Sequence, residues 1–326
     1  MNDNRYTGMI NRRKNGFWSY FRRNYMLYTM LIVLIVSLVI FSYIPMLGIQ
    51  IAFKDWQIPF GDRPGGQWGS PWATDAAGNL DLFKYFKELF SDSYFWKTFG
   101  NTLRISGLRI VFGFPMPIIL VLLLNELTSE KVKKTVQSIS YLPYFISWVI
   151  ISNIFTDLTK TDSGLQLLLE KIFGRQIEFF GDNDSFVVLL IVTDIWKNAG
   201  WGTIIYFAAL MSVSPELYEA AEVDGANRWN KMVHITLPGI IPALTVNLIF
   251  TLSGIIYGGF DQVFNMYNPL VYDKGDILET YLYRTGVLGG SYSKGTALGL
   301  FNSLIGLALT LTANKFVKLI GGDGIW

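Results

Sequence analysis

An apolar stretch at residues 186–213 contains polar and aromatic side chains in its middle: Asp194, Trp196, Lys197, Asn198 and Trp201. Counted back from the end of the stretch at about 1.5 Å per residue, Trp201 lies on the order of 18 Å inside it, near the middle of a bilayer. Ionisable groups at that depth are costly unless they face a polar cavity or each other. Because Asp194 and Lys197 are three residues apart, they can also pair on one helix face. The pattern therefore indicates either a polar path or an internal ion pair.

A second apolar stretch, at residues 239–260, carries small, hydroxyl and amide groups at comparable depth. Its candidate residues are Asn247, Thr251, Gly254, Tyr257 and Gly258. An aromatic ring with nearby hydroxyls suits a sugar, because the C–H face of a sugar packs on a ring and its edge hydroxyls need hydrogen-bond partners. The glycines have a second interpretation, which is close packing of helices.

The stretch at residues 101–124 contains two prolines and two arginines. Pro115 and Pro117 predict kinks in its helix. Arg104 and Arg109 lie toward its outer end. There are three alternatives for them: they face a translocation path, extend to the membrane interface or pair with a neighbouring helix.

The composition excludes several kinds of chemistry. The 326 residues include no cysteine and one histidine, His234, so a disulfide framework or a thiolate metal site is impossible and a metal site is not expected. No Gly-x-x-x-x-Gly-Lys-Ser/Thr phosphate loop is present, so we expect no cofactor on this chain and no ATP bound to it. The net charge of +2 gives no reason to expect nucleic acid as a partner. No nucleophile and base arrangement suggests an enzyme.

Hydrophobic residues make up 51% of the chain and charged residues 16%, and the distribution of the two is uneven. Apolar runs of about 17 to 25 residues recur, and a run of that length can cross about 30 Å of hydrocarbon. We predict an all-α membrane protein with six transmembrane helices at residues 25–46, 101–124, 141–155, 186–213, 239–260 and 295–316.

Charge sets the predicted orientation. Residues 1–25 form a basic segment that reads as cytoplasmic, or alternatively as a partner-binding arm, and residues 26–326 form the membrane domain. A basic short loop at residues 131–134 and the lysines after the last span also lie inside, so both termini are cytoplasmic. Residues 47–100 become an external loop with some helix near residues 82–90.

A polar, helix-forming hairpin at about residues 214–238 separates the fourth and fifth spans. Ser214 suits a helix N-cap and Pro215 the first helical position. Glu216 and Glu219 are expected in the first turn, where the helix dipole favours negative charge. Gly225 supplies a left-handed stop after Asp224. A second short helix is expected from about residue 226 to 233, with Pro238 opening the next span.

The hairpin residues resemble a known motif: Glu219-Ala220-Ala221, Gly225, Ile235 and Leu237-Pro238. The spacing is similar to the cytoplasmic coupling loop in permease subunits of binding-protein-dependent ABC importers. The resemblance covers some 20 positions. Weaker similarities at Asn101-Thr102-Leu103 and Tyr141-Leu142-Pro143 favour the carbohydrate-uptake branch, of the maltose type or serving complex oligosaccharides.

The resemblance implies a permease fold with six transmembrane helices in the bacterial cytoplasmic (inner) membrane. Its partners would be a second permease subunit, a paralogue or another copy of this chain, a pair of ATPase subunits that bind ATP and Mg, an external solute-binding protein, and membrane lipid. The solute would be a sugar, and an oligosaccharide is favoured. A permease for a non-sugar solute, a membrane-embedded enzyme and a self-contained secondary transporter are the alternatives.

The resemblance also assigns residue roles. Contact with the ATPase is expected of Glu219, Ala220, Ala221, Asp224, Gly225, Ile235, Leu237 and Pro238. The substrate path is expected to include Trp201, Asn198, Lys197, Asp194, Asn247, Thr251, Gly254, Tyr257 and Gly258. In maltose-type permeases the solute lies between the corresponding spans, but Gly254 and Gly258 depart from the larger side chains there. We therefore expect a pocket of different shape.

Overall fold

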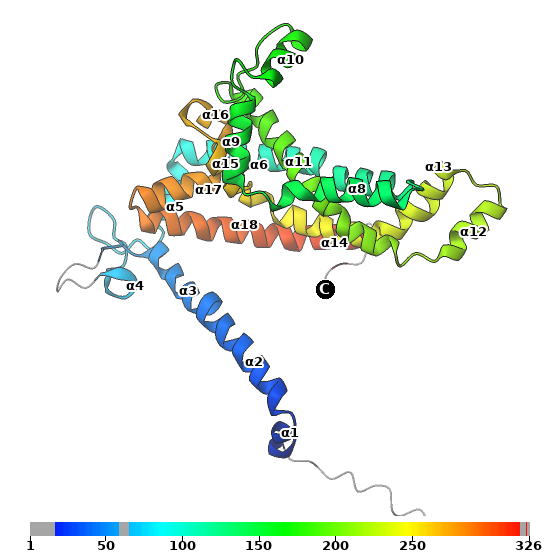
Figure 1. Ribbon diagram of the computed structural model, residues 1–326. Helices are drawn as coiled ribbons and strands as arrows, with labels where there is room; N and C mark the ends of the chain where they lie inside the picture. The colour runs from blue at the N-terminus through cyan, green and yellow to red at the C-terminus, as the bar shows by residue number, and fades with distance from the viewer. Residues whose placement is uncertain (1–16, 59–64, 320–323, 325–326) are drawn as a thin grey trace, which may run out of the picture.

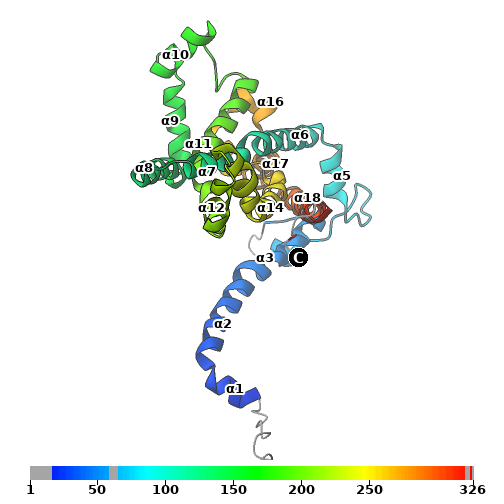
Figure 2. The ribbon, with the colours of Figure 1, turned by 90° about the vertical axis from the view of Figure 1, so that its right-hand side faces the viewer.

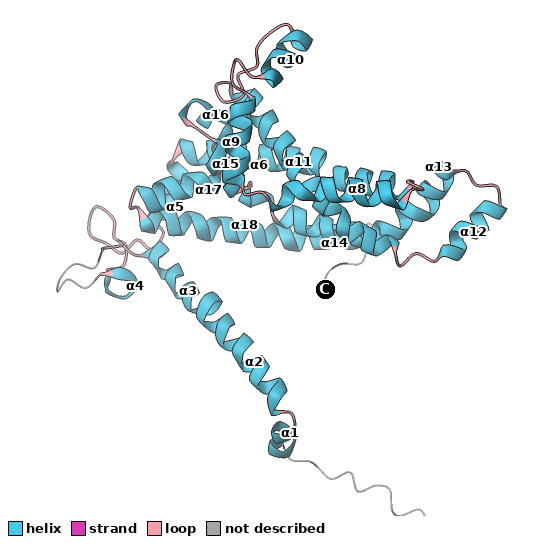
Figure 3. Ribbon diagram, in the orientation of Figure 1, coloured by secondary structure: helices cyan, strands magenta, loops and turns pink. Residues whose placement is uncertain are grey.

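A computed structural model describes residues 17–58, 65–319 and 324. Most of the predicted basic segment, residues 1–16, lies outside the described residues. Within the described part the chain is helical and contains no named strand (Figure 3). Two isolated antiparallel bridges, Lys54–Trp72 and Thr74–Leu80, tie the loop after the first helical run.

The first helical run stands apart from the rest of the molecule. After α1 (Phe17–Arg23), the run Tyr25–Phe53 comprises α2 (Tyr25–Leu38), a π segment, α3 (Ile44–Met46) and a 3₁₀ segment. None of its most apolar 18 residues is buried. It projects away from the other helices in two perpendicular views (Figures 1 and 2). An apolar helix without cover from its own chain needs lipid or another subunit around it.

The following loop contains α4 (Gly66–Gly69) and α5 (Lys84–Ser91), which agrees with the helix expected near residues 82–90. Asp55 anchors this loop, because its carboxylate accepts from Lys84 Nζ at 2.8 Å and from the Tyr85 hydroxyl at 2.6 Å. Partial burial alone would raise the pKa of Asp55, but hydrogen bonds from Lys84, Tyr85 and the Thr74 amide together outweigh it and lower the pKa.

The second run, Ser93–Asn125, starts earlier than the predicted span. It consists of α6 (Ser93–Leu108), a π segment at Arg109–Gly113 and α7 (Pro115–Asn125). Proline lacks an N–H donor, and the wider π turn immediately before Pro115 accommodates it. The Phe114 amide accordingly donates to the Arg109 carbonyl at 3.2 Å. The helix therefore continues through the expected kink region.

The next two predictions need correction. The basic residues 131–134 lie in a helix, α8 (Glu130–Tyr141), and not in a loop. The expected third span at residues 141–155 is not one straight helix, because α8 and the 3₁₀ turn Leu142–Phe145 meet α9 (Trp148–Leu158) at an angle of 102°. Pro143 lies within that turn, where a regular helix would lose a backbone hydrogen bond. After α9 the chain forms α10 (Gly164–Phe173) at the periphery.

The long helix α11 (Asn183–Leu210) is the central element of the bundle. It packs against α7, α8 and α14 (Leu237–Ser253). Its N-terminal half contributes Phe186, Leu190 and Ile191 to the largest buried apolar cluster among the described residues. Its C-terminal half contributes Tyr206 to a second cluster that includes Val121 and Ile240.

The hairpin between α11 and α14 consists of α12 (Pro215–Val223) and α13 (Arg228–Lys231). The second short helix does not stop near residue 233, as expected, because one helical run extends over Arg228–Ser253. A π segment at Met232–Thr236 precedes Pro238 and admits it without a break. In Figure 1 the hairpin forms one end of the molecule, opposite α5.

The fifth span also ends earlier than expected. The helix stops at Ser253, and a 3₁₀ turn leads to Gly258 and Gly259, both with positive φ. Short helices follow: α15 (Phe260–Met266), the 3₁₀ turn Pro269–Val271, α16 (Tyr272–Gly275), α17 (Leu278–Leu282) and a π segment at Tyr283–Leu288. The left-handed glycines explain why the span is interrupted before residue 260.

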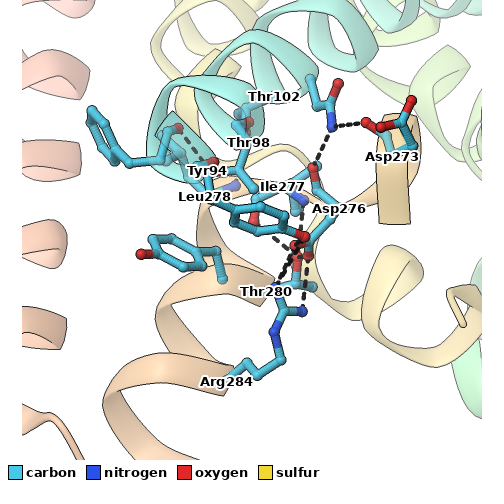
Figure 4. Close-up of polar contacts among 12 residues, drawn as sticks. Tyr94, Thr98, Thr102, Asp273, Asp276, Ile277, Leu278, Thr280 and Arg284 are labelled. Carbon is cyan, nitrogen blue, oxygen red and sulfur yellow. Dashed lines mark hydrogen bonds and ion pairs between the residues drawn. The ribbon is translucent and has the colours of Figure 1, made fainter. Parts of the chain in front are cut away.

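A buried carboxylate holds this outer segment on α6 (Figure 4). Asp276 is 0% exposed, and it accepts from the Tyr94 hydroxyl at 2.6 Å and from the Thr280 hydroxyl at 2.7 Å. Arg284 pairs with the same carboxylate. The Asn101 amide donates to the Asp276 carbonyl at 3.0 Å. A buried charge needs this many partners, so the cluster ties two distant parts of the sequence together.

The last helix is α18 (Tyr292–Leu319), which packs along α14 (Figure 1). Within the described residues, four continuous helical runs are long and apolar enough to cross a membrane, and the bent pair at residues 130–158 would be a fifth. The four are Tyr25–Phe53, Ser93–Asn125, Arg228–Ser253 and Tyr292–Leu319.

Candidate functional site

A cavity of about 370 Å³ lies where the π segment after α6, the middle of α11 and the end of α14 meet. Seven of the nine residues predicted for the path line it: Asp194, Asn198, Trp201, Asn247, Thr251, Gly254 and Gly258. They come from α11 and from α14 with the turn that follows it, which are adjacent in the bundle. Ser106 and Arg109 close the cavity from a third element.

Asp194 and Arg109 form the charged side of the cavity. The Asp194 carboxylate accepts from the Asn198 amide at 2.9 Å and lies 4.0 Å from Arg109 Nε. The Arg109 guanidinium also donates to the Gly258 carbonyl and to the Gln262 side chain. Its Nε is buried without a hydrogen-bond partner. Charge pairing at this depth makes both groups tolerable and keeps the side of the cavity polar.

The glycine pair after α14 makes room for that arginine. A Cβ on Gly259 would lie 2.1 Å from a guanidinium nitrogen of Arg109. Gly259 also has φ of +77°, which side chains rarely adopt. Gly258 lines the cavity and also packs closely against Thr102 and Ile277. It therefore fits both interpretations of the glycines, as part of the path and as a site of close packing.

Trp201 supplies an aromatic wall. Its ring is parallel to that of Tyr144, with 4.4 Å between centroids and 3° between planes. Phe145 meets it edge-on at 5.4 Å. The indole remains 39% exposed and lines the cavity. Asn247 also lines the cavity, and its amide nitrogen donates to the Tyr206 hydroxyl at 2.8 Å.

Two of the predicted path residues lie elsewhere. Lys197 is 8% exposed and points to the bend between α8 and α9. Tyr257 is 48% exposed, and its hydroxyl lies beside Gly306 of α18. The ion pair considered for Asp194 and Lys197 does not form, because each has other partners.

Sequence reasoning did not select Tyr144, Gly259 or Gln262 for the site. Tyr144 lies in the stretch that is predicted to begin the third span. Gln262 follows the break in the fifth span, which apolar content alone did not reveal. The glycine pair was the available signal, because two adjacent glycines often mark a backbone that must turn.

The hairpin forms a separate surface. Gly225 has φ of +76°, and the Ala226 amide donates to the Ala221 carbonyl at 2.8 Å, which is the Schellman end of a helix. Of the two glutamates expected in the first turn of α12, Glu216 lies there, whereas Glu219 lies one turn further on. Ser214 lies at the N-cap position but makes no side-chain capping bond.

Two polar contacts hold the hairpin closed while much of its outer surface stays uncovered. Lys231 pairs with Glu222 at 2.6 Å and lowers the pKa of that carboxyl, and Tyr218 bonds to Thr236 at 3.1 Å. Glu219, Ala220, Asp224 and Pro238 are exposed. The exposed large apolar side chains are Leu217, Val223 and Trp229. Of the remaining predicted residues, Leu237 packs inward on the cluster around Tyr206. Among the described residues, no group of carboxylates, histidines or cysteines could hold a metal ion.

The fold and the two surfaces define a class of protein. Several helices suit a membrane, a cavity with charged and amide side chains lies among them, and an exposed helical hairpin projects from one end. Residues 113–321 match the family described as the binding-protein-dependent transport system inner membrane component. The chain belongs to this family, and is therefore a non-catalytic inner-membrane subunit of an importer.

Individual relatives are similar over nearly the whole chain. Protein LplB of Bacillus subtilis (strain 168) is 39% identical over 306 residues, 94% of this chain and 92% of the relative. The polygalacturonan/rhamnogalacturonan transport system permease protein YteP of the same organism is 38% identical over 301 residues, 92% of this chain and 90% of the relative. The crystal structure of a bacterial alginate ABC transporter in complex with alginate pentasaccharide-bound periplasmic protein contains a similar chain. That chain has a TM-score of 0.83 and 37% identity, with 95% of this chain and 99% of the other covered.

Proposed function

We propose that this chain forms one side of the translocation path for an oligosaccharide, with the cavity at Trp201 as its solute-binding part. The observation that carries the proposal is the combination of an indole ring with amide and hydroxyl groups around one cavity of about 370 Å³. A sugar ring needs an aromatic plane for its C–H face and hydrogen-bond partners for its edge. Similarity to YteP and to the alginate transporter supports an oligosaccharide.

The proposal extends to the partners. An external binding protein delivers the sugar, and a second permease, a paralogue of this chain, completes the path. A pair of ATPase subunits binds ATP and Mg and docks on the hairpin at residues 214–238. The exposed Leu217 and Val223 beside Glu219 support docking, because apolar side chains rimmed by charge are typical of an interface.

The proposed topology has six spans with both termini in the cytoplasm. It uses the four long apolar runs, the bent pair α8–α9 and α11. The 28 residues of α11 are long enough to cross, and its polar groups turn toward the cavity and the bend. The hairpin then lies inside and residues 54–92 outside.

The test is uptake by the purified complex in proteoliposomes, with the binding protein on one side and ATP on the other. The panel consists of oligogalacturonide, alginate and maltose-series oligosaccharides, with an amino acid as the non-sugar control. We expect ATP-dependent uptake of at least one oligosaccharide and none of the amino acid. Uptake of the amino acid alone would contradict the sugar assignment. Analysis of the co-purifying subunits identifies the second permease.

A further inference from the structure

The 102° bend between α8 and α9 leaves backbone carbonyls without their helical partners. In a continuous helix the carbonyls of Tyr144 and Ile146 would accept from amides four residues ahead. At the bend the Ile146 amide turns back to Pro143 at 3.1 Å, and the Ile150 amide bonds to the Ser147 hydroxyl. Bare carbonyls in an apolar setting are costly, so the bend needs an outside donor.

Lys197 is that donor. Its ammonium donates to the carbonyls of Tyr144 at 2.8 Å and of Pro143 at 3.4 Å, and also to that of Ile146. An ammonium group has three protons, so each of them has a backbone carbonyl to bind at the bend. The site is also the C-terminal end of the helical run Glu130–Phe145, where the helix dipole favours a cation.

The side chain of Tyr144, at the bend, packs on the same turn of α11 that carries Lys197. Lys197 and Trp201 are four residues apart, so they lie on one face of α11. Lys197 binds the Tyr144 carbonyl, and Trp201 stacks on the Tyr144 ring at 4.4 Å. The ammonium also lies 5.4 Å from the centre of the Trp148 ring beyond the bend. Residue 144 is therefore held at its backbone and at its ring by neighbouring positions of one helix.

We propose that Lys197 is a positioning residue that holds the bend between α8 and α9 and thereby fixes the Tyr144 ring against Trp201. Its importance for transport rests on the proposed function, because the ring matters only if the solute passes Trp201. The hold on the bend is independent of any solute. Lys197 thus acts through the aromatic wall, whereas the sequence had suggested direct contact with the path.

The first test measures hydrogen exchange in the assembled complex, without solute. In Lys197→Met, which keeps the length of the side chain and loses its donors, we expect amides in residues 144–151 to exchange at least about tenfold faster, because tenfold corresponds to one lost buried contact. Peptides from α18 should be unchanged. Lys160→Met is the matched control, because Lys160 pairs at the surface with Asp157 near the far end of α9. Unchanged exchange in Lys197→Met would overturn the proposal.

The second test is a double-mutant cycle in the uptake assay, with the panel oligosaccharide that gives the highest rate. If Lys197 acts through Tyr144, the losses from Lys197→Met and Tyr144→Ala should not multiply, and the double variant should match Tyr144→Ala within about threefold. Multiplicative losses, or faster exchange with full uptake, would overturn the positioning role. If no panel sugar is taken up, the proposed function fails while the exchange test still decides the bend.

A second variant guards against a failure of Lys197→Met to assemble. Lys197→Gln keeps two N–H donors without the charge, so we expect exchange between that of the native chain and that of Lys197→Met. Exchange at the native rate in Lys197→Gln, with no change in uptake, would show that the ammonium is dispensable and would overturn the proposal.

Discussion

On the scale of single residues, two charges on one turn of α11 are stabilised by different neighbours. Asp194 faces the cavity and is balanced by Arg109 and Asn198. Lys197 faces away and is balanced by backbone carbonyls. A charged side chain at membrane depth is tolerated only when nearby groups compensate its charge. Asp194 is therefore part of the cavity, and Lys197 is part of the bend.

Trp201 gives the first prediction at this scale. Trp201→Ala removes the ring that lines the cavity, and we expect uptake to fall by about fivefold or more, since stacking on an aromatic is worth about 1 kcal/mol. Trp196→Ala is the matched control on the same helix, because Trp196 packs on Phe155 and does not line the cavity. Uptake is measured per assembled complex. Equal rates for native and Trp201→Ala over a range of sugar concentrations would exclude Trp201 from the path.

Glu279 gives a pH-dependent prediction. Burial, with a contribution from nearby Asp261, raises its pKa to about 7, while a hydrogen bond from the Phe260 amide opposes the shift. A raised carboxyl pKa means that the folded state prefers the protonated form. This contribution to stability is complete below the ordinary pKa of the unfolded chain and is lost as the pH rises through about 7.

The variant Glu279→Gln imitates the protonated group at every pH. We expect its melting temperature to match that of the native complex near pH 4.5, to exceed it increasingly up to about pH 7 and to keep a constant advantage above that. Thermal unfolding of the assembled complex at several pH values measures the difference. An advantage that does not change with pH would mean that Glu279 is already charged in the folded protein.

On the scale of elements, the hairpin is a rigid unit built for contact. Its two short helices are held together by the Lys231–Glu222 pair and by the turn at Gly225, and α13 continues directly into α14. A displacement of the hairpin is therefore transmitted along a continuous helix of 26 residues. A flexible connection would absorb the same movement.

Gly225 tests the turn. No atom lies within 4 Å of a Cβ placed there, so only its φ of +76° restricts the residue. Gly225→Val should cost about 1–2 kcal/mol locally and impair uptake, because β-branched residues avoid this region. Gly225→Asn should be tolerated, because asparagine adopts left-handed φ more readily. Similar uptake by the two variants, with native insertion, would contradict a role for the turn in coupling.

Glu219 tests the proposed docking surface. Its exposed carboxylate makes no ion pair or hydrogen bond within the described part of the chain, so reversing its charge should leave the chain intact. We expect Glu219→Lys to weaken co-purification of the ATPase and to abolish ATP-driven uptake, whereas Glu170→Lys on the distant α10 should change neither. Full association of Glu219→Lys with the ATPase would remove Glu219 from the interface.

On the scale of the whole molecule, the arrangement leaves large surfaces to be covered. The helix α2 touches little of its own chain, although the 3₁₀ segment at the end of the same run packs on α18. The hairpin projects at one end (Figures 1 and 2). Both features fit a subunit that works inside an assembly in a membrane. The absence of cysteine from the chain makes its topology directly testable.

Single cysteines decide the orientation. Leu80→Cys lies in the proposed external loop and Val223→Cys in the hairpin, and the native side chains are 65% and 88% exposed. In intact cells an impermeant maleimide should label Leu80→Cys, and it should label Val223→Cys only after permeabilisation. The native chain is the unlabelled control. The reverse pattern would overturn the proposed topology.

The sequence by itself determined the class of this protein, because span length, charge bias and the Glu219–Pro238 spacing are local properties of the chain. It also selected seven residues of the cavity, since helix geometry sets their depth. Only the tertiary structure decided which way Lys197 and Tyr257 point, because direction around a helix depends on its neighbours. The tertiary structure also decided the bend after Phe145 and the break at Gly258–Gly259, because apolar content alone does not distinguish a straight helix from an interrupted one. At the bend Lys197 binds the free carbonyls, and at the break the backbone makes room for Arg109.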